Sequence, residues 1–274
     1  MSPLTGKVAI VTGSGRGIGR AIAGKLASAG AAVVVNDLDD GPAGETTAAI
    51  EAAGGRAVAC NGDVAAADFG DRIVAVALAE LGGLDIIVNN AGYIWNTTIQ
   101  NNTDEQWQAM LDVHATAPFR LLRAAQGHFR DCARREAAEG APVHRKVVNI
   151  SSVSGLYGSA TQGAYAAGKM AVVGLTKSLA KEWGRHCVNV NAVAYGFIGT
   201  RLTQSFDGEP AAIEVHGRRH KVGFPTEMAA RLHEGTSLGR AGTTAEAAGA
   251  VYILCLPEAD FITGQVLVCD GGHH

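Results

Sequence analysis

Short apolar segments alternate with longer alanine-rich segments along almost the whole chain, and this alternation limits the fold more than any other feature. The short segments, such as residues 7–12 (KVAIVT) and 32–36 (AVVVN), are rich in β-branched residues. Strands that are apolar on both faces occur mainly in parallel sheets that helices cover on both sides. The sequence therefore predicts an α/β fold, in which a doubly wound parallel sheet of about seven strands carries helices on both faces.

The same alternation places each element along the chain. Strands are expected at residues 7–12, 32–36, 57–60, 84–88, 146–151, 188–194 and 265–268. Helices are expected at residues 17–29, 43–53, 66–81, from 103 to beyond 129, 162–183 and 244–254. Neither an internal repeat nor a low-complexity linker divides the chain, so residues 1–274 are expected to form a single domain.

A cluster of glycines stands where the first expected strand meets the first expected helix. The cluster follows Thr12 and consists of Gly13, Ser14, Gly15, Arg16, Gly17, Ile18 and Gly19. Glycines at this junction let the backbone approach a pyrophosphate, whose charge is stabilised by the amides at the helix N-terminus. The cluster predicts a dinucleotide site in a Rossmann-type fold, with a dinucleotide-binding half at about residues 1–150.

Asp37 ends the second expected strand, at the distance from the glycines where dinucleotide-binding proteins carry an acidic residue. Its carboxylate can accept hydrogen bonds from the adenosine ribose hydroxyls, whereas it repels the additional phosphate of NADP. We therefore expect NAD as the cofactor, with Arg16 in the glycine loop partly offsetting this preference.

Tyr165 and Lys169 are four residues apart in the expected helix at 162–183, so their side chains leave the same face. A nearby ammonium group favours the phenolate and is expected to lower the pKa of Tyr165 from about 10 toward neutrality. Ordinary amphipathic helices often carry the same pair. The pair therefore indicates acid–base chemistry only in combination with other motifs.

Further motifs accompany the pair at the spacing of a known family. They are TGxxxGxG (Thr12, Gly13, Gly17, Gly19), Asp63-Val64, Asn89-Asn90-Ala91-Gly92, Ser152, Gly196-Phe197-Ile198-Gly199-Thr200, Thr263-Gly264-Gln265 and Asp270-Gly271-Gly272. In these motifs the chain resembles the classical, single-domain type of the short-chain dehydrogenase/reductase family, from Gly6 to Gly272. The resemblance implies hydride transfer between a nicotinamide and a small-molecule alcohol or ketone.

The resemblance also implies roles for the matching residues. Tyr165 would exchange a proton with the substrate oxygen, Ser152 would hydrogen-bond that oxygen, and Lys169 would bind the nicotinamide ribose and lower the pKa of Tyr165. The other implied cofactor contacts are Asp63, Val64, Asn90, Ala91, Gly92, Gly196, Ile198 and Thr200. Structural roles stay open as well: Ser152 could cap a strand end, Asn90 could make turn bonds, and Thr200 could cap a helix.

Two residues depart from the family pattern. His114 stands where the family usually has a fourth catalytic residue, an asparagine. It either preserves a water-linked proton relay from Lys169 or packs in its helix with a local hydrogen bond. Tyr195 replaces a usual proline, and its ring either fills the pocket beside the nicotinamide or packs against the sheet edge.

The catalytic and substrate-binding half, at about residues 151–274, includes the segment 201–234, where the family has its mobile substrate lid. A basic run at 216–221 is either a solvated surface or a site for a carboxylate or the phosphates of coenzyme A or a carrier protein. Residues 130–145 form either a solvated helical extension or a subunit contact. The expected walls of the substrate pocket are Ile94, Trp95, Ser154, Tyr157, Gln162, Tyr195 and Phe197.

Composition disfavours several other classes of protein. A formal charge of −3 offers neither nucleic acid nor an anionic membrane a basic surface. The 5 cysteines contain no CxxC pair, so neither a metal site nor disulfides are expected, and a reducing cytoplasm fits best. Neither export nor a membrane span is expected, because the sequence shows no basic leader and no apolar run approaching about 18 residues. No function is assigned to His273 and His274.

Three classes of function compete. The first is an NAD-linked oxidoreductase for 3-oxoacyl or 3-hydroxyacyl thioesters, and the second applies the same chemistry to a sugar, polyol, steroid or other small secondary alcohol. The third is a catalytically silent dinucleotide-binding protein, which the joint presence of Ser152, Tyr165 and Lys169 disfavours. The resemblance further implies assembly into a homotetramer or a homodimer.

Overall fold

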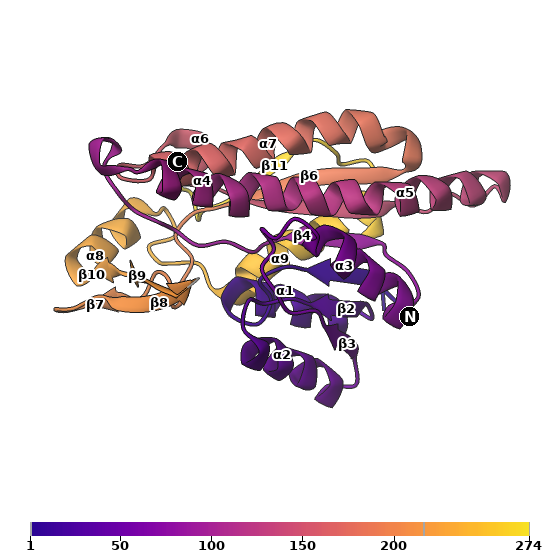
Figure 1. The fold of residues 1–274 in the computed structure, drawn as a ribbon, viewed down its shortest axis with the longest axis horizontal. Helices are drawn as coiled ribbons and strands as arrows, with labels where there is room; N and C mark the ends of the chain where they lie inside the picture. The colour runs from indigo at the N-terminus through magenta and orange to yellow at the C-terminus, as the bar shows by residue number, and fades with distance from the viewer. Residues whose placement is uncertain (1, 216, 274) are drawn as a thin grey trace.

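The computed structural model describes residues 2–215 and 217–273, and a parallel sheet forms its centre. The strands of this sheet are β1 (Val8–Val11), β2 (Ala32–Val35), β3 (Arg56–Ala59), β4 (Ile86–Asn89), β5 (Arg145–Ser152), β6 (Val188–Tyr195) and β11 (Val266–Cys269). Their order is β11-β6-β5-β4-β1-β2-β3 (Figure 1). The order reverses between β1 and β4, and doubly wound sheets bind ligands at the carboxyl ends of strands that flank such a reversal.

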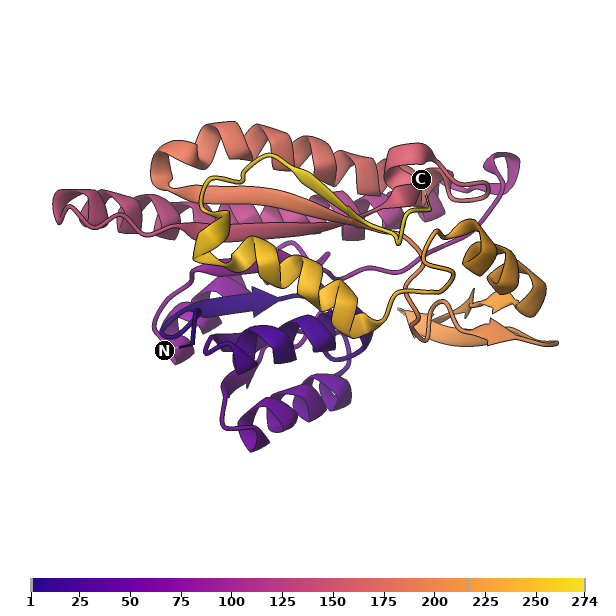
Figure 2. The same cartoon turned by 180° about the vertical axis from the view of Figure 1, so that it is seen from behind.

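Helices cover both faces of the sheet, as the front and back views show (Figure 1, Figure 2). One face carries α1 (Gly17–Ser28), α2 (Asp40–Ala52) and α9 (Thr244–Cys255), and the other carries α3 (Phe69–Val76), α5 (Ala117–Ala138) and α7 (Gly163–Trp183). Within β1, Ala9 and Val11 belong to the first core, whereas Val8 and Ile10 belong to the second. This is the period-two alternation of a strand buried on both sides. The predicted doubly wound fold with seven strands is confirmed.

The remaining helical segments each span 10 residues or fewer. They are α4 (Asp104–Leu111), α6 (Val153–Tyr157), α8 (Thr226–Gly235), the 3₁₀ turns η2 (Ile99–Asn101), η4 (Gly184–His186) and η5 (Pro257–Ala259), and the π-helical turns η1 (Ala77–Leu81) and η3 (Asp112–Thr116). A capping box begins α4, because the side chains of Thr103 and Gln106 each bond the other's backbone amide. None of the described helices is long and apolar enough to cross a membrane.

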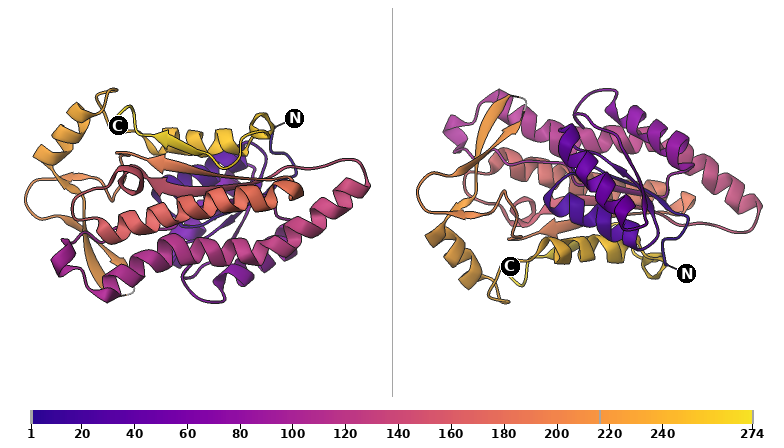
Figure 3. Two further views of the ribbon diagram at one scale, coloured as in Figure 1. Left: turned by 90° about the horizontal axis from the view of Figure 1, so that it is seen from above. Right: turned by 90° about the horizontal axis from the view of Figure 1, so that it is seen from below.

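The predicted lid, residues 201–234, forms a small unit at one end of the molecule (Figure 3). It contains an antiparallel hairpin of β8 (Ala211–Val215) and β9 (Arg218–Val222), a short parallel pair of β7 (Ser205–Phe206) and β10 (Phe224–Pro225), and α8. The sequence did not indicate the hairpin. One of its buried positions is occupied by His220, a polar residue, so the strand does not show the usual alternation of apolar and polar residues. Residue His216 and the side chain of Arg219, both in the predicted basic run, lie outside the described residues.

Residues 130–138 continue α5 as a helical extension that projects beyond the sheet (Figure 1). Glu136 of this extension forms a bidentate ion pair with Arg145, the first residue of β5. The distances are 2.6 Å (Nη2 to Oε1) and 3.0 Å (Nη1 to Oε2). Hydrogen bonding from Arg145 holds the pKa of the Glu136 carboxyl below its usual value. Residues 130–138 have the predicted helical form, whereas residues 139–144 are not helical and lead into β5. A buried ion pair that the sequence did not indicate anchors the end of the helix to β5.

Candidate active site

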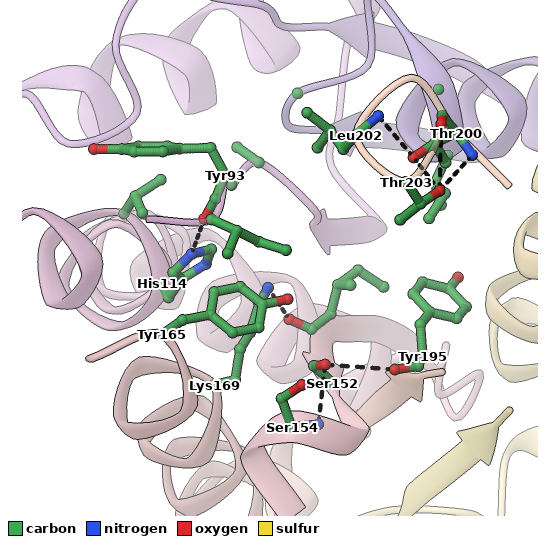
Figure 4. Close-up of a pocket in the computed structure, with 18 of the residues that line it drawn as sticks. Tyr93, His114, Ser152, Ser154, Tyr165, Lys169, Tyr195, Thr200, Leu202 and Thr203 are labelled. Carbon is green, nitrogen blue, oxygen red and sulfur yellow. Dashed lines mark hydrogen bonds between the residues drawn. The ribbon is translucent and has the colours of Figure 1, made fainter. Parts of the chain in front are cut away.

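The carboxyl ends of the central strands and the lid enclose a continuous cavity of about 1040 Å³. The glycine loop and Asp37 line one end of the cavity, and the lid lines the other. Ser152, Tyr165 and Lys169 lie between them, and their side chains gather at the cavity in Figure 4. Most of the residues that the sequence predicts for cofactor binding, and all of those predicted for catalysis, therefore line one cavity.

Close backbone packing explains two of the loop glycines. Gly13 has a φ of +60°, and a Cβ there would lie 2.7 Å from the Cα of Ala91. A Cβ at Gly19 would collide with the carbonyl of Gly13. The side-chain amide of Asn90 donates from Nδ2 to the carbonyls of Thr12 and Gly13, at 2.9 and 3.0 Å. Asn90 thus makes the turn bonds that the sequence left open, and they hold the loop in shape.

The N-terminus of α1 has the properties of an anion site. Gly17, Ile18 and Gly19 line the cavity, and no side chain caps this helix end. Gly17 has a φ of +54°, and nothing lies within 4 Å of where its Cβ would be. Uncapped amides beside open space at the positive end of a helix fit the pyrophosphate of a dinucleotide.

Asp37 lines the cavity beside the glycine loop. One carboxylate oxygen accepts a hydrogen bond from the amide of Gly15 at 3.1 Å, and the other accepts one from the amide of Asp39 at 3.3 Å. Asp39 also forms an ion pair with Arg16, at 2.8 Å between Nη2 and Oδ2. The cation that could offset the charge of Asp37 is therefore already paired.

Ser152 stands at the junction of β5 and α6, where the backbone holds its hydroxyl in place. Its Oγ accepts a hydrogen bond from the amide of Ser154 at 3.2 Å and donates one to the carbonyl of Tyr195 at 3.5 Å. The same hydroxyl also acts on the phenol of Tyr165, whose pKa it lowers. Ser152 thus caps α6 and faces the phenol at once, so its structural and functional roles are compatible.

Burial shifts the pKa values of Tyr165 and Lys169 in the directions that favour the neutral form of each side chain. Desolvation raises the pKa of Tyr165 to about 12, against an opposing effect of the hydrogen bond with Ser152. Desolvation lowers the pKa of Lys169 to about 7. The Nζ of Lys169 lies 5.7 Å from the centre of the Tyr165 ring and donates to the carbonyl of Ile150 at 2.8 Å.

Within the chain itself, the pKa of Tyr165 therefore moves opposite to the direction predicted from the sequence. The four-residue spacing brings the two side chains together as expected, but it does not report that Lys169 is buried and that Tyr165 is only partly exposed at the cavity. An amine whose own pKa has fallen to about 7 is only partly protonated at neutral pH, so it stabilises a phenolate less than a permanent positive charge would.

His114 lies in the π-helical turn η3 and is buried against Tyr165. The two rings meet edge to face, with 5.0 Å between their centres. The Nε2 of His114 is 2.8 Å from the carbonyl of Tyr93, whereas its buried Nδ1 has no hydrogen-bond partner among the described residues. Desolvation and the charge of Lys169 hold the pKa of His114 well below its usual value. A neutral imidazole with one proton must therefore donate from Nε2, because a carbonyl only accepts.

We expect His114→Asn to make the protein less sensitive to acid. The folded wild type keeps His114 neutral, whereas the unfolded chain protonates it near pH 6.5, so below this pH the unfolded state binds one more proton. The free energy of unfolding should then fall by up to about 1.4 kcal/mol per pH unit more in the wild type than in the variant. Urea unfolding at pH 5, 6 and 7.5 measures this, and equal slopes would show that His114 titrates normally.

Tyr195 combines features of both alternatives that the sequence left open. Its ring lines the cavity, but its hydroxyl points away and donates to the carbonyl of Ala247 in α9 at 2.6 Å. Burial raises the pKa of this phenol. Tyr195 thus offers the cavity an apolar ring surface, while its polar group is used to fasten β6 to α9.

The other predicted site residues divide into two groups. Those that line the cavity are Asp63, Val64, Asn90, Ala91, Gly92, Ile94, Ser154, Gln162, Gly196, Phe197, Ile198 and Thr200. Four do not line it in the described structure: Ser14, Gly15, Trp95 and Tyr157. Ser14 is fully buried with its hydroxyl on the carbonyl of Val11, and the side chain of Tyr157 is 55% exposed at the end of α6.

Several residues of the lid and of the C-terminal segment line the cavity but were not predicted from the sequence. They are Ile213, Val215, Phe224, Met228, Leu232 and His273. Apolar residues within the segment 201–234 were the available signal, but their spacing did not show which of them face the cavity. His273, to which the sequence assigned no function, lies against Gly235 at the end of α8.

Comparison with known proteins gives consistent matches along the chain. A family model described as short chain dehydrogenase matches residues 7–210. A 3-oxoacyl-[acyl-carrier-protein] reductase of Synechocystis sp. is 35% identical over 274 residues, covering 99% of this chain and 98% of the relative. Hydroxyacyl-CoA dehydrogenase ChsB1 of Mycobacterium tuberculosis is 43% identical over 195 residues, covering 69% of this chain and 61% of the relative.

Solved structures agree with these matches. A mutant short-chain dehydrogenase/reductase of Serratia marcescens is 31% identical, has a TM-score of 0.83, and is matched over 99% of both chains. The fold and the cavity thus define the class as a nicotinamide dinucleotide-binding oxidoreductase with a doubly wound sheet. The chain belongs to the short-chain dehydrogenase/reductase family.

Proposed function

We propose that this chain is an NAD(H)-dependent oxidoreductase that interconverts a secondary alcohol and a ketone, with Tyr165 as the general acid and base. The convergence of Ser152, Tyr165 and Lys169 on a cavity that also reaches the uncapped N-terminus of α1 carries the proposal. Burial that shifts the pKa of Lys169 to about 7 lowers folding stability. A catalytically silent binding protein has no use for such an amine.

The chain's own groups account for the handling of the substrate oxygen and the proton. When bound, the nicotinamide supplies or accepts the hydride. Ser152, oriented by the amide of Ser154, hydrogen-bonds the substrate oxygen and fixes its position. Tyr165 gives its phenolic proton to that oxygen during reduction and takes it back during oxidation. Lys169 can hold or release a proton near neutral pH and so restores the protonation state of Tyr165.

NAD rather than NADP is the proposed cofactor. Support comes from the carboxylate of Asp37 at the cavity wall and from the Arg16–Asp39 ion pair, which engages the neighbouring cation. An additional phosphate near Asp37 would meet a negative charge at short range, without a free cation from Arg16 to balance it.

Asp37→Ala is expected to weaken NAD binding and to relax the discrimination against NADP. Loss of one charge-assisted acceptor for the ribose hydroxyls should raise the Kd for NAD by about tenfold, since hydrogen bonds to charged groups contribute about 1.5–3 kcal/mol. Fluorescence titrations with NADH and NADPH measure both effects. Asp39→Ala is the companion variant: it frees Arg16 and leaves Asp37 in place, so it should relax the discrimination against NADP without weakening NAD binding. An unchanged preference in Asp37→Ala would remove Asp37 from its proposed role.

Acyl thioesters, in their 3-oxo or 3-hydroxy forms, are the leading proposal for the substrate. Ile213, Met228 and Phe224 of the lid give the far end of the cavity an apolar wall, which suits an acyl chain better than a polyol. The side chain of Gln162, 9% exposed, has a buried Oε1 without a hydrogen-bond partner among the described residues. Rotation of this amide would present its NH₂ group to a second carbonyl, such as that of a thioester. The named relatives that act on 3-oxoacyl and hydroxyacyl compounds lend further support.

A substrate panel tests the function. Acyl thioesters, steroids, sugars and polyols, each as the alcohol and as the ketone, are assayed with NAD(H) and NADP(H) by the absorbance of the reduced nicotinamide. Turnover of thioesters with NAD(H) supports the leading proposal, whereas turnover of polyols or sugars alone supports the second class. Absence of turnover with every compound, together with tight cofactor binding, would favour the silent binding protein.

Assembly into a homotetramer or homodimer in the cytoplasm is also proposed. Large apolar side chains are exposed on α4, α5 and α7, namely Trp107 (41%), Phe119 (46%) and Met170 (49%). Exposed apolar surface of this kind is typical of subunit interfaces. Light scattering of the purified chain measures the oligomeric state, and a monomer at micromolar concentration would contradict it.

A further inference from the structure

His220 is 5% exposed although it lies on the two-stranded hairpin of the lid. Alternate residues of a strand share a face, so Arg218, His220 and Val222 point to the same side of β9. This side faces the loop that follows β4. The ring of His220 meets the ring of Tyr93 at 5.1 Å and that of Trp95 at 4.6 Å, both edge to face.

Arg218 extends the same contact toward α4. Its guanidinium lies 6.0 Å from the centre of the Trp95 ring and forms an ion pair with Glu105 at 2.5 Å. Both charged side chains are more than half exposed, so this pair alone contributes little stability. The buried aromatic contacts of His220 therefore attach the hairpin to the loop at residues 93–95 through Tyr93 and Trp95.

Tyr93 connects this attachment to the catalytic centre. Its ring touches His220, and its carbonyl accepts the hydrogen bond from His114. His114 in turn lies edge to face against the ring of Tyr165. The packing leaves His114 little freedom: a Cβ at Gly168 would lie 2.9 Å from the Cβ of His114, and one at Gly92 would collide with its ring. A shift of Tyr93 therefore has to move the imidazole or break its hydrogen bond.

We propose that His220 is a positioning residue, through which the docked lid hairpin holds the loop at residues 93–95 and thereby aligns His114 against Tyr165. The lid then contributes more than a wall for the substrate, because its docking also orders the surroundings of the general acid and base. The inference rests on the function proposed for Tyr165. It predicts that loosening the hairpin lowers kcat even for a substrate too small to reach the lid, since small misplacements of catalytic groups slow the chemical step.

Replacement of the His220 ring tests the proposal. With the smallest substrate that the panel identifies, His220→Ala should lower kcat by about tenfold, and His220→Phe, which keeps an aromatic ring, should restore it to within about twofold. Val222→Ala is the matched control, because it removes apolar bulk from the same face of the same strand but leaves the ring. Its kcat should stay within about twofold of the wild type. Equal losses in His220→Ala and Val222→Ala would overturn the proposal.

Hydrogen exchange supplies a readout that does not depend on activity. Amide protection in peptides that cover residues 92–96 and 112–116 should fall in His220→Ala and remain in His220→Phe and Val222→Ala. Unchanged protection in His220→Ala would contradict the proposed link between the hairpin and the loop.

A double-mutant cycle with His114→Ala tests the route of the effect. If His220 acts through His114, the addition of His220→Ala to His114→Ala should change kcat by less than twofold. Multiplicative losses would show that the two residues act independently and would overturn the route. The assay also separates this inference from the proposed function: activity that survives Tyr165→Phe refutes the role of Tyr165, whereas Tyr165-dependent activity with multiplicative losses refutes only the role of His220.

Discussion

Tyr165→Phe is expected to lower kcat by about 10³-fold, within the range by which positioned general acids and bases accelerate reactions. The variant keeps the ring that packs against His114 and removes only the hydroxyl that we propose exchanges the proton. Folding and the affinity for NADH should therefore change little. Single-turnover measurements with the best substrate of the panel, together with a fluorescence titration of NADH, measure the two quantities separately.

Ser152→Ala is the companion variant for this measurement. It removes the hydroxyl that is proposed to hydrogen-bond the substrate oxygen, but leaves the phenol of Tyr165 in place. A smaller loss in Ser152→Ala than in Tyr165→Phe is expected, because the proton donor remains. Activity of Tyr165→Phe close to that of the wild type would overturn the proposed mechanism.

Lys169→Met should lower kcat/KM by at least about 100-fold, because it removes the amine that is proposed to restore the proton of Tyr165. Methionine fills a similar volume without a charge, so the buried site is preserved. The affinity for NAD(H) is expected to fall as well, whereas Lys177→Met, an exposed lysine on the same helix, should leave both quantities unchanged. Loss of cofactor affinity with unchanged kcat would assign Lys169 to binding alone.

The same variant has a signature in stability against pH. The amine of Lys169 has a pKa of about 7 in the folded chain and about 10.4 when unfolded, so between these values the unfolded state binds more protons. The free energy of unfolding of the wild type should therefore rise relative to Lys169→Met by up to about 1.4 kcal/mol per pH unit from pH 7 to 10. Denaturant titrations at several pH values measure this difference. A constant difference would show that Lys169 remains charged in the folded chain.

The order of the sheet elements was predictable because the signals for strands and helices are local. The residues of β1 alternate between the two cores, and the glycines after it have the backbone conformations that its tight turn requires. The interruption of the long helix by η3 was not predictable, because a π turn changes the helical period only slightly. Likewise, the lid hairpin depends on a histidine at a buried position, which hydrophobic periodicity does not register.

In the candidate site, too, local sequence signals were predictive, whereas contacts between distant segments were not. Tyr165, Lys169 and Asp37 were singled out from spacing and chemistry and Ser152 from the family resemblance, and all four line the cavity. Trp95, in contrast, was expected in the substrate pocket, whereas its ring is packed against His220. The partner of a side chain in a loop depends on which distant segment docks there, and here that segment is more than 100 residues away in the chain.

Residue type and spacing were therefore sufficient for the doubly wound fold, because the signals for its strands, its helices and the glycine turn are local. The acid–base role of Tyr165 and Lys169 was indicated only in combination with the other family motifs, and it remains a proposal. The pKa of Tyr165, the neutral state of His114 and the outward hydroxyl of Tyr195 depended on the assembled fold. Withdrawal from water and the position of a hydrogen-bond partner are set by segments that meet only in three dimensions. For this reason the sequence identified the groups that can exchange a proton, and the folded chain determined which of them is charged.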